Sequence, residues 1–290
     1  MIAPSAKAQS AAQSVPGGTV ASGVSPENYK FLQQEIYRES GIVLDADKHY
    51  LLESRLTPVM REAKLASLDE LCGRLRAKAS PALAQRVIEA LTTNETLFFR
   101  DMAPFEALRQ RLIPELLEKR RMQKPAIWSA AASSGQEAYS IAMLWREMGL
   151  AEKPIDILGT DLSEQILDRA REAKYVQFEV NRGLPAPYLV KYFQRQGLDW
   201  QLKDEIRKMV RFRRFDLRQA MAGLGMFDIV FCRNVLIYFD VPTKTKILEQ
   251  ILTVLNPGGY LLLGGAETTL NLQDKFERVT VGTTVVYRKG

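Results

Sequence analysis

The feature that most constrains the fold is an alternation of short β-rich runs with helical patterns after about residue 120. Strands are expected at 126–130, 155–159, 210–215, 227–232 and 260–263, with helices between several of them. Such alternation builds βαβ units around a parallel sheet. Two last runs, 276–281 and 283–288, flank Gly282 and predict a hairpin at one edge. The sequence therefore predicts an α/β domain with a doubly wound, Rossmann-like sheet.

The residues before this region predict a small all-α domain over 25–91. Ser25-Pro26-Glu27 is typical of an N-cap followed by proline in the first helical turn, and apolar residues then recur with helical spacing. Further helices are expected at about 46–64, 67–79 and 82–91. Residues 1–24 are rich in Ala, Ser, Gly and Gln and lack the apolar core of a signal peptide, so we expect a disordered tail there.

One window of the chain carries its whole formal charge of +6. Between Lys174 and Arg218 there are 11 Lys and Arg residues against 5 Asp and Glu, and the remainder holds 29 of each. Within this window the alternation of strands and helices is interrupted. A helix around 187–195 and a short strand at 199–202 predict an inserted subdomain over about 175–208. The window either contacts an acidic partner or is a solvated face.

The composition argues against several classes of site. His49 is the only histidine, which excludes a multi-histidine metal site and argues against hydrolases built on Ser-His-Asp or Cys-His sets. The two cysteines, Cys72 and Cys232, are too few for a disulfide framework and are typical of a reduced, cytoplasmic protein. No apolar run approaches the roughly 20 residues of a membrane-spanning helix. We expect no metal.

Polar residues follow the predicted strands, at the edge where open parallel sheets bind ligands. After successive strands come the small-residue turn 131–137, then Asp161, then Asp216 and Leu217, then Arg233 and Asn234. Neither GxxxxGK[ST] nor a GxGxxG following a strand is present, and the first turn has a single glycine. A nucleoside ligand without a pyrophosphate therefore fits this turn better than ATP or a dinucleotide.

These features also have purely structural interpretations. Ser133 with Gln136, and Ser134 with Glu137, match the capping-box pattern, so Glu137 could serve only its own helix, and Asp161 could cap the next one. The segment 92–101 could be a linker whose phenylalanines fill a domain interface. The residues alone leave these alternatives open.

Three long runs, in the right order, resemble a known family. They are residues 91–101 (LTTNETLFFRD), 128–143 (WSAAASSGQEAYSIAM) and 227–240 (FDIVFCRNVLIYFD). Together they resemble the CheR family, the bacterial glutamate methyltransferases of chemotaxis receptors. The similarity extends from about residue 25 to the C-terminus. It implies that the α/β domain, residues 92–290, binds S-adenosylmethionine and carries a small inserted β-subdomain.

The resemblance also implies a reaction and a site. Methyl would pass from S-adenosylmethionine to glutamate γ-carboxylates on the cytoplasmic helices of methyl-accepting chemoreceptors, giving methyl esters and S-adenosylhomocysteine. By the family pattern the cofactor site is lined by Asn94, Thr96, Arg100, Glu137, Asp161, Asp216, Leu217, Arg233 and Asn234. Asp161 would contact the ribose hydroxyls, and Asp216 and Leu217 would lie beside the adenine. We expect Arg100 to orient the substrate carboxylate and Tyr238 to supply a second polar contact.

Three departures from the family pattern are visible. The first turn has Gln136 where glutamate is usual, and Asp216 stands where many members have asparagine. A carboxylate at 216 can accept a hydrogen bond from the adenine amino group but cannot donate one. The hairpin region 194–202 looks shorter than in enteric members, whose insertion docks on a receptor C-terminal pentapeptide. We therefore expect a version that does not need this tether.

Two other functions compete with this prediction. A nucleic-acid methyltransferase would suit the basic window, but the chain lacks an Asn/Asp-Pro-Pro-aromatic motif and the window has few aromatic residues for stacking bases. The other is an inactive cofactor-binding or receptor-docking module, against which retention of the site residues argues. We expect a cytoplasmic monomer whose partner is the receptor, with no nucleic-acid partner and no membrane insertion.

Overall fold

The computed structural model describes residues 24–290 apart from 46–48, 119–123, 270–271 and 273. The predicted disordered tail therefore lies outside the described residues, except for Val24. None of the described helices has the length and apolar content that crossing a bilayer requires. Cys72 and Cys232 are both buried, free thiols.

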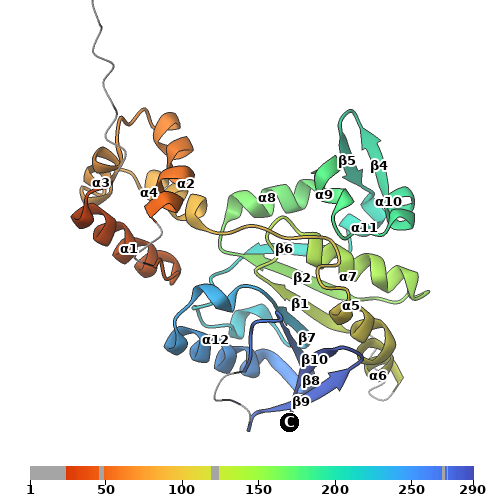
Figure 1. Ribbon diagram of the computed structural model, residues 1–290. Helices are drawn as coiled ribbons and strands as arrows, with labels where there is room; N and C mark the ends of the chain where they lie inside the picture. Colours follow the sequence, from red (N-terminus) through yellow and green to blue (C-terminus); the bar gives the residue numbers. More distant parts are fainter. Residues whose placement is uncertain (1–23, 46–48, 119–123, 270–271, 273) are drawn as a thin grey trace, which may run out of the picture.

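The N-terminal residues fold into a helical unit (Figure 1). Its helices are α1 Pro26–Ser40, α2 His49–Glu62, α3 Leu68–Arg76 and α4 Pro81–Leu91. Ser25, Ser67 and Ser80 each accept a hydrogen bond from the backbone N–H three residues further on, which fixes where α1, α3 and α4 begin. The apolar faces of the helices meet in one buried cluster that includes Leu32 and Leu52.

The remainder of the chain is built on a seven-stranded sheet in the order β6-β2-β1-β7-β8-β10-β9. The strands are β1 Ala126–Ala130, β2 Asp156–Asp161, β6 Val210–Arg214, β7 Phe227–Cys232, β8 Leu255–Leu263, β9 Phe276–Val281 and β10 Thr284–Lys289. The strands from β6 to β8 are parallel, and the hairpin of β9 and β10 adds the antiparallel edge, as predicted. After edge strand β6 the chain crosses to β7, on the other side of β1. The carboxyl ends of β1 and β7 thus flank a topological switch point.

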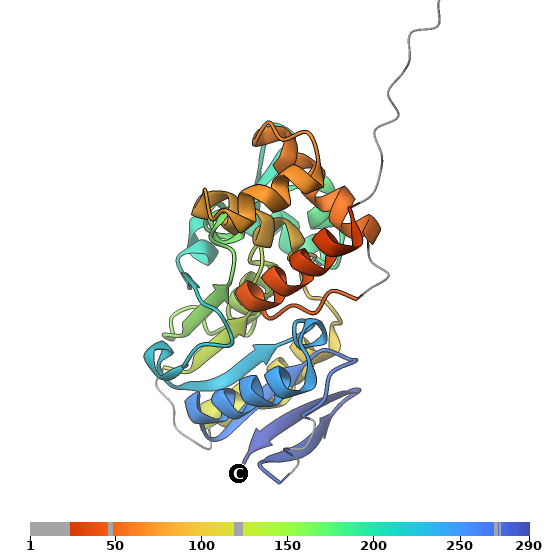
Figure 2. The same cartoon turned by 90° about the vertical axis from the view of Figure 1, so that its left-hand side faces the viewer.

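Helices cover both faces of this sheet (Figures 1 and 2). They are α5 Ala103–Ala107, the π-helical turn η1 Leu108–Leu112, α6 Ile113–Glu118, α7 Gln136–Glu147, α8 Glu164–Glu172 and α12 Val241–Val254, with short 3₁₀ turns η2 Ala222–Leu224 and η3 Leu236–Tyr238. Neighbouring residues of β1 face opposite layers. Ile127 packs into the cluster that contains Trp145 of α7, and Trp128 into the one that contains Ile247 of α12. The fold has the predicted doubly wound architecture.

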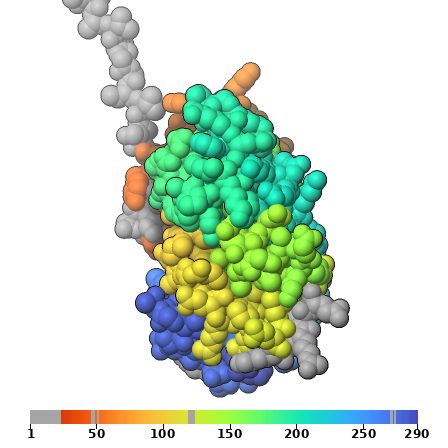
Figure 3. Space-filling model, turned by 90° about the vertical axis from the view of Figure 1, so that its right-hand side faces the viewer, coloured from red at the N-terminus to blue at the C-terminus, as the bar shows by residue number. Residues whose placement is uncertain are grey.

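An inserted subdomain stands between α8 and β6. Its elements are β3 Lys174–Val176, α9 Gln177–Asn181, α10 Ala186–Tyr192, β4 Phe193–Gln196, β5 Asp199–Leu202 and α11 Asp204–Arg207, and its strands form an antiparallel sheet in the order β3-β5-β4. Figure 3 shows it, in green to cyan, capping the sheet domain above α7. The sequence predicts a helix around 187–195, and the predicted C-terminal end of this helix is wrong. It ends at Tyr192, because Phe193 is already extended (φ −119°, ψ 159°) and pairs with Leu202.

The helical unit contacts the sheet domain through the end of α1 (Figure 2). The Tyr37 hydroxyl donates to Asp240 Oδ2 at 2.7 Å, and the Val43 N–H donates to the Tyr238 carbonyl at 2.9 Å. Both acceptors belong to the loop that follows β7. The helical unit is therefore docked next to the carboxyl edge of the sheet.

Candidate active site

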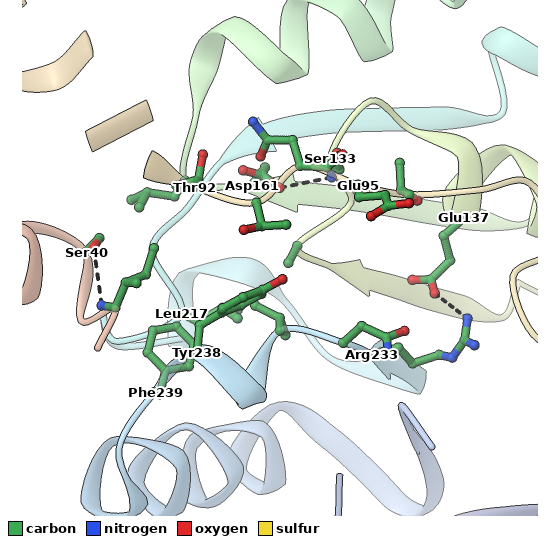
Figure 4. Close-up of a pocket in the computed structure, with 18 of the residues that line it drawn as sticks. Ser40, Thr92, Glu95, Ser133, Glu137, Asp161, Leu217, Arg233, Tyr238 and Phe239 are labelled. Atoms are coloured by element: carbon green, nitrogen blue, oxygen red, sulfur yellow. Dashed lines mark hydrogen bonds and ion pairs between the residues drawn. The ribbon is translucent and has the colours of Figure 1, made fainter. Parts of the chain in front are cut away.

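Every residue predicted for the cofactor site and for the chemistry lines one pocket at the carboxyl edge of the sheet (Figure 4). These residues are Asn94, Thr96, Arg100, Glu137, Asp161, Asp216, Leu217, Arg233, Asn234 and Tyr238. The pocket encloses about 940 Å³ of space, part of it open to solvent. Ser40 and Ile42, from the end of α1, complete its wall.

The turn after β1, which lines the pocket with Ala131 and Ser133, has an unusual backbone. Ala131, Ser133 and Gly135 all have left-handed φ values, of 60°, 51° and 93°. A Cβ on Gly135 would lie 3.0–3.1 Å from three neighbouring side chains, so this position is both strained and crowded for any other residue. The turn is tied across the pocket to 92–101, because the Ser133 hydroxyl donates to the Asn94 carbonyl at 2.8 Å.

Asp161 is held at the end of β2 by backbone donors. Its Oδ2 accepts from the Ser133 N–H at 2.9 Å and its Oδ1 from the Ser163 N–H at 3.1 Å. Burial raises the pKa of this carboxyl, and the backbone hydrogen bonds oppose that rise. The interpretation of Asp161 as a helix cap is wrong, since Ser163 caps α8 by accepting from the Ile166 N–H. Each Asp161 oxygen retains a lone pair for a hydroxyl donor.

Glu137 and Arg233 form a buried ion pair that locks the pocket together. Arg233 Nη1 lies 2.9 Å from Glu137 Oε2, and the side chain of Arg233 is only 2% exposed. The other Arg233 amino group donates to the Arg100 carbonyl at 2.8 Å and pairs with Asp101 at 2.9 Å. The Ser129 hydroxyl donates to Glu137 Oε1. The capping-box interpretation of Glu137 is wrong, because the N-cap of α7 is Gly135, which has no side chain to cap it, and Glu137 pairs with Arg233.

Segment 92–101 is both an interface filler and a pocket wall. Phe98 and Phe99 are buried in the core that contains α7, and the Phe99 N–H donates to the Ser140 hydroxyl at 2.9 Å. The buried phenylalanines anchor the segment, so that Asn94, Thr96 and Arg100 line the pocket. The two interpretations left open by the sequence therefore describe the two faces of one segment.

Three groups in the pocket have unused bonding capacity. Within the described part of the chain, Arg100 makes no ion pair, and its Nη1 donates only to the Glu95 carbonyl, at 3.3 Å. Asn234 Oδ1 is buried and has no hydrogen-bond partner among the residues that the structure describes. The Tyr238 hydroxyl, carried by η3, points into the pocket (Figure 4). An unpaired buried acceptor costs about 1–3 kcal/mol, so a ligand that donates a hydrogen bond to Asn234 would relieve that cost.

Comparison with known proteins identifies the family. The model for the CheR methyltransferase all-alpha domain matches residues 27–92, and that for the CheR methyltransferase SAM binding domain matches residues 94–285. The chain belongs to the CheR methyltransferase family. The resemblance predicted from three runs of residues is thereby confirmed, and the α/β domain is an S-adenosylmethionine-binding methyltransferase domain.

The CheR relatives span nearly the whole chain. It is 41% identical over 267 residues to chemotaxis protein methyltransferase 1 of Pseudomonas aeruginosa, covering 90% of this chain and 97% of the relative. It is 41% identical over 273 residues to chemotaxis protein methyltransferase Cher2 of Pseudomonas putida, covering 91% and 99%. For the chemotaxis protein methyltransferase of Vibrio parahaemolyticus the values are 41% over 271 residues, covering 91% and 98%. None of these three names refers to a nucleic-acid substrate, so the competing prediction of a nucleic-acid methyltransferase is not favoured.

Two departures from the CheR pattern have local partners. Gln136 Oε1 accepts from the Ser134 hydroxyl at 2.8 Å, and its amide lies 3.5 Å from Glu179 Oε1. An amide can donate to Glu179, where a second carboxylate would repel it. Asp216 accepts from Arg218 with both oxygens, including Nη2 to Oδ2 at 2.6 Å. Any contact of Asp216 with adenine would have to use the remaining lone pairs.

Sequence reasoning missed Glu267, which holds the loop after β7. Its carboxylate accepts four backbone hydrogen bonds, from the N–H groups of Asn234, Val235, Ile237 and Gly264, at 2.7–3.3 Å. Asn234 has a left-handed φ of 57°. The carboxylate thus fixes the strained turn that carries Asn234 and leads to Tyr238. Glu267 belongs to no recognisable sequence motif. The one signal that could have identified it is its place, as a polar residue just after the β-rich run 260–263.

No cluster of three or more His, Cys, Asp or Glu side chains with the geometry of a metal site occurs in the part of the chain that the structure describes. His49 stacks on Tyr29 in the helical unit, with ring centroids 3.7 Å apart, and does not line the pocket. The ionisable groups of the pocket are therefore its carboxylates, its arginines and Tyr238.

Proposed function

We propose that the chain methylates the γ-carboxylates of glutamate side chains in bacterial chemoreceptors, producing glutamate methyl esters and S-adenosylhomocysteine. The observation that carries this proposal is the pocket at the switch point. It combines the CheR family's site residues with an arginine and a buried acceptor that lack an ion-pair or hydrogen-bond partner among the described residues, and with an inward-pointing hydroxyl. The relatives' names, which all refer to chemotaxis, support the receptor as substrate.

The residues present fit S-adenosylmethionine. Asp161 would accept from the ribose hydroxyls, and Leu217 offers an apolar surface to the adenine beside Asp216. Asn234 Oδ1 suits the α-ammonium group, a donor that needs a buried acceptor. The Arg100 guanidinium complements the negative charge of a carboxylate in the pocket. The remaining expected contacts are with Asn94, Thr96, Glu137 and Arg233.

The chemistry asks the protein for alignment rather than for a base. When bound, S-adenosylmethionine supplies an electrophilic methyl group, which a carboxylate oxygen can accept. A glutamate carboxylate is ionised at neutral pH, since its ordinary pKa is about 4.3, so no side chain has to remove a proton. Arg100 orients the substrate carboxylate, and the Tyr238 hydroxyl provides a second contact while its ring helps to exclude water.

The Arg100 role can be tested with radiolabelled S-adenosylmethionine and receptor-containing membranes. Arg100→Ala should lower the rate of base-labile receptor labelling by about 10²–10³, as expected when one charge-stabilising donor is lost. Arg109→Ala is the matched control, because Arg109 is an exposed arginine on η1 that pairs with Glu106 outside the pocket. Turnover near wild type in Arg100→Ala would remove Arg100 from the mechanism. Labelling that resists base would contradict glutamate as the acceptor.

We also propose that receptor recognition needs no C-terminal pentapeptide tether. The inserted hairpin is short, with four-residue strands β4 and β5 joined at Gly197 and Leu198. Calorimetry with a receptor C-terminal pentapeptide should show no binding at micromolar concentrations. Micromolar or tighter affinity would contradict this proposal, and the methyltransferase function would be unaffected.

A further inference from the structure

The end of α1 forms one wall of the cofactor pocket. Ser40 and Ile42 line the pocket together with Leu217 and Phe239, although the first two belong to the helical unit and the others to the sheet domain. Gly41, with a φ of 74°, ends the helix, and the Ile42 N–H donates to the Ser40 hydroxyl at 3.2 Å (Figure 4). The pocket is therefore complete only when the helical unit is docked.

Arg218 binds the end of α1 from the sheet domain. Its guanidinium donates to the carbonyls of Tyr37, Arg38 and Glu39, at 3.4 Å for Tyr37 and 3.0 Å for Arg38. The last carbonyls of a helix lack partners within the helix and carry partial negative charge, which a cation stabilises. A Cβ on Gly41 would lie 2.7 Å from Arg218 Cδ, so the backbone at Gly41 and the Arg218 side chain are also in close contact.

Asp216 holds Arg218 in this position. Asp216 Oδ1 accepts from the backbone N–H of Arg218 at 2.9 Å and from Nε at 3.0 Å, while Oδ2 accepts from Nη2 at 2.6 Å. The two side chains are 13% and 25% exposed. Asparagine at 216 would offer one acceptor oxygen and no charge. The departure at 216 is thus matched to the arginine two residues later.

We propose that Arg218 is a positioning residue that fixes the end of α1 as a wall of the cofactor pocket, coupling docking of the helical unit to cofactor binding. This rests on the proposed use of S-adenosylmethionine. Leu217, between Asp216 and Arg218, faces the pocket, so the segment that contacts the cofactor also carries the arginine that contacts α1. Coupling is reciprocal: whatever docking adds to cofactor affinity, the cofactor adds to docking.

The first test is binding of S-adenosylhomocysteine to the full chain by calorimetry. Arg218→Met keeps an apolar stem without the guanidinium and should raise the Kd about tenfold. Arg218→Lys keeps a cation but loses the planar guanidinium with its several donors, so its Kd should fall between those of wild type and Arg218→Met. Arg211→Met is the matched control. Arg211 lies on β6, the strand that precedes the segment with Arg218, and pairs with Asp156 at 2.7 Å, outside the pocket. Its loss should leave the Kd unchanged.

Two further measurements separate positioning from direct contact or simple stability. If Asp216 acts through Arg218, the double variant Asp216→Asn with Arg218→Met should bind no more weakly than Arg218→Met. Additive losses would show that Asp216 affects cofactor binding independently of Arg218 and would contradict its action through that arginine. In hydrogen exchange, S-adenosylhomocysteine should protect the amides of 41–43 in the wild type but not in Arg218→Met, with a similar melting temperature for both apo proteins.

Two results would overturn the inference in different ways. A Kd within twofold of wild type for Arg218→Met would remove the positioning role and leave the proposed function standing. Absence of S-adenosylhomocysteine binding by the wild-type chain would overturn the proposed cofactor use, and the coupling with it.

Discussion

At the residue scale, the loop after β7 depends on one carboxylate, that of Glu267, which does not itself line the pocket. Glu267 is 8% exposed and is surrounded by backbone N–H groups of the turn 234–237 and of Gly264. Gly264 has no room for a side chain, since a Cβ there would lie 2.7 Å from Glu267 Oε2. The position of Asn234 therefore reflects a residue 33 positions further along the chain.

Glu267→Gln should lower kcat/KM for receptor methylation at least tenfold. The amide has one acceptor oxygen in place of two, and each hydrogen bond to a charged group is worth about 1.5–3 kcal/mol. Asp228→Asn is the control. Asp228 is also a buried carboxylate, and it accepts from the Ala126 N–H at 2.9 Å, at the amino edge of the sheet. Both variants should lose stability in thermal melts, but only Glu267→Gln should lose turnover; equal kinetic losses would make the effect one of stability.

The sequence pointed to the pocket residues at strand ends because parallel strands bring their carboxyl ends together whatever lies between them. It could not predict that Glu137 pairs with Arg233, because the two are 96 positions apart and the capping-box pattern gave a sufficient local account. The same limit hid the pairing of Gln136 with Glu179. Local patterns identify which residues are placed at an edge, and tertiary contacts decide what each one binds.

At the element scale, segment 92–101 is pressed between the sheet domain and the inserted subdomain. Gly183, just after α9, has a φ of 81°, and a Cβ there would lie 2.1 Å from the Phe98 carbonyl oxygen. Gly183→Ala should therefore displace the segment that carries Asn94 and Arg100, weaken cofactor binding several-fold, and cost more than the roughly 1–2 kcal/mol of left-handed strain alone.

The control for this prediction is Gly197→Ala. Gly197 is also left-handed, with a φ of 64°, but nothing lies within 4 Å of its added Cβ. It should lose only the strain energy and bind S-adenosylhomocysteine like wild type, as measured by calorimetry and chemical denaturation. Equal effects of the two variants would mean that segment 92–101 does not depend on the inserted subdomain.

The inserted subdomain is also fastened to α7 by Glu147. Its carboxylate pairs with Lys191 at 2.7 Å and accepts from the Tyr192 hydroxyl. Both contacts lower the pKa of Glu147, and the contact with Lys191 has the larger effect. A lowered carboxyl pKa adds stability that is present above the unfolded value, about 4.3, and is lost as pH falls through the folded value. Thermal melts of wild type and Glu147→Gln should differ at pH 7 and converge in acid. A difference that persists unchanged well below pH 4 would contradict this role.

The elements with a clear sequence pattern were predicted, whereas the elements and helix ends that depend on tertiary contacts were not. The sheet strands and the hairpin at Gly282 follow from β-rich runs and turn residues. Strand β3 has three residues and forms only because Lys174–Val176 pairs with β5. The helix predicted at 67–79 ends at Arg76, since Ala77 caps it and Lys78 is left-handed, with a φ of 49°. Lysine gives no signal for such a turn.

At the scale of the whole molecule, the basic window is spread over the inserted subdomain and β6, and part of it is neutralised internally. Arg207 is half-buried, pairs with Asp204 at 3.0 Å and donates to the Arg171 carbonyl. Arg211 pairs with Asp156, and Arg218 serves the docking of α1. Exposed Arg195 makes no ion pair with any described residue and donates only to the Gly197 carbonyl. The charge available to a partner is therefore a subset of the charge in the sequence.

Charge reversal at Arg195, Lys203 and Arg207 should slow receptor methylation more than it weakens cofactor binding, if the window steers an acidic receptor surface. Arg195→Glu is the cleanest of the three, because reversal at Arg207 also breaks its internal contacts. Lys246→Glu, on the exposed side of α12 and away from the inserted subdomain (Figure 1), is the matched control.

The expected signature is a dependence on salt. Charges are screened beyond about 8 Å at 0.15 M ionic strength, so the gap in kcat/KM between wild type and Arg195→Glu should be several-fold at low salt and should close as salt is raised. Lys246→Glu should change neither kcat/KM nor its dependence on salt. If Arg195→Glu reduced S-adenosylhomocysteine binding as much as methylation, the window would not be a docking surface, because steering acts on the encounter with the receptor and leaves the occupied cofactor pocket untouched.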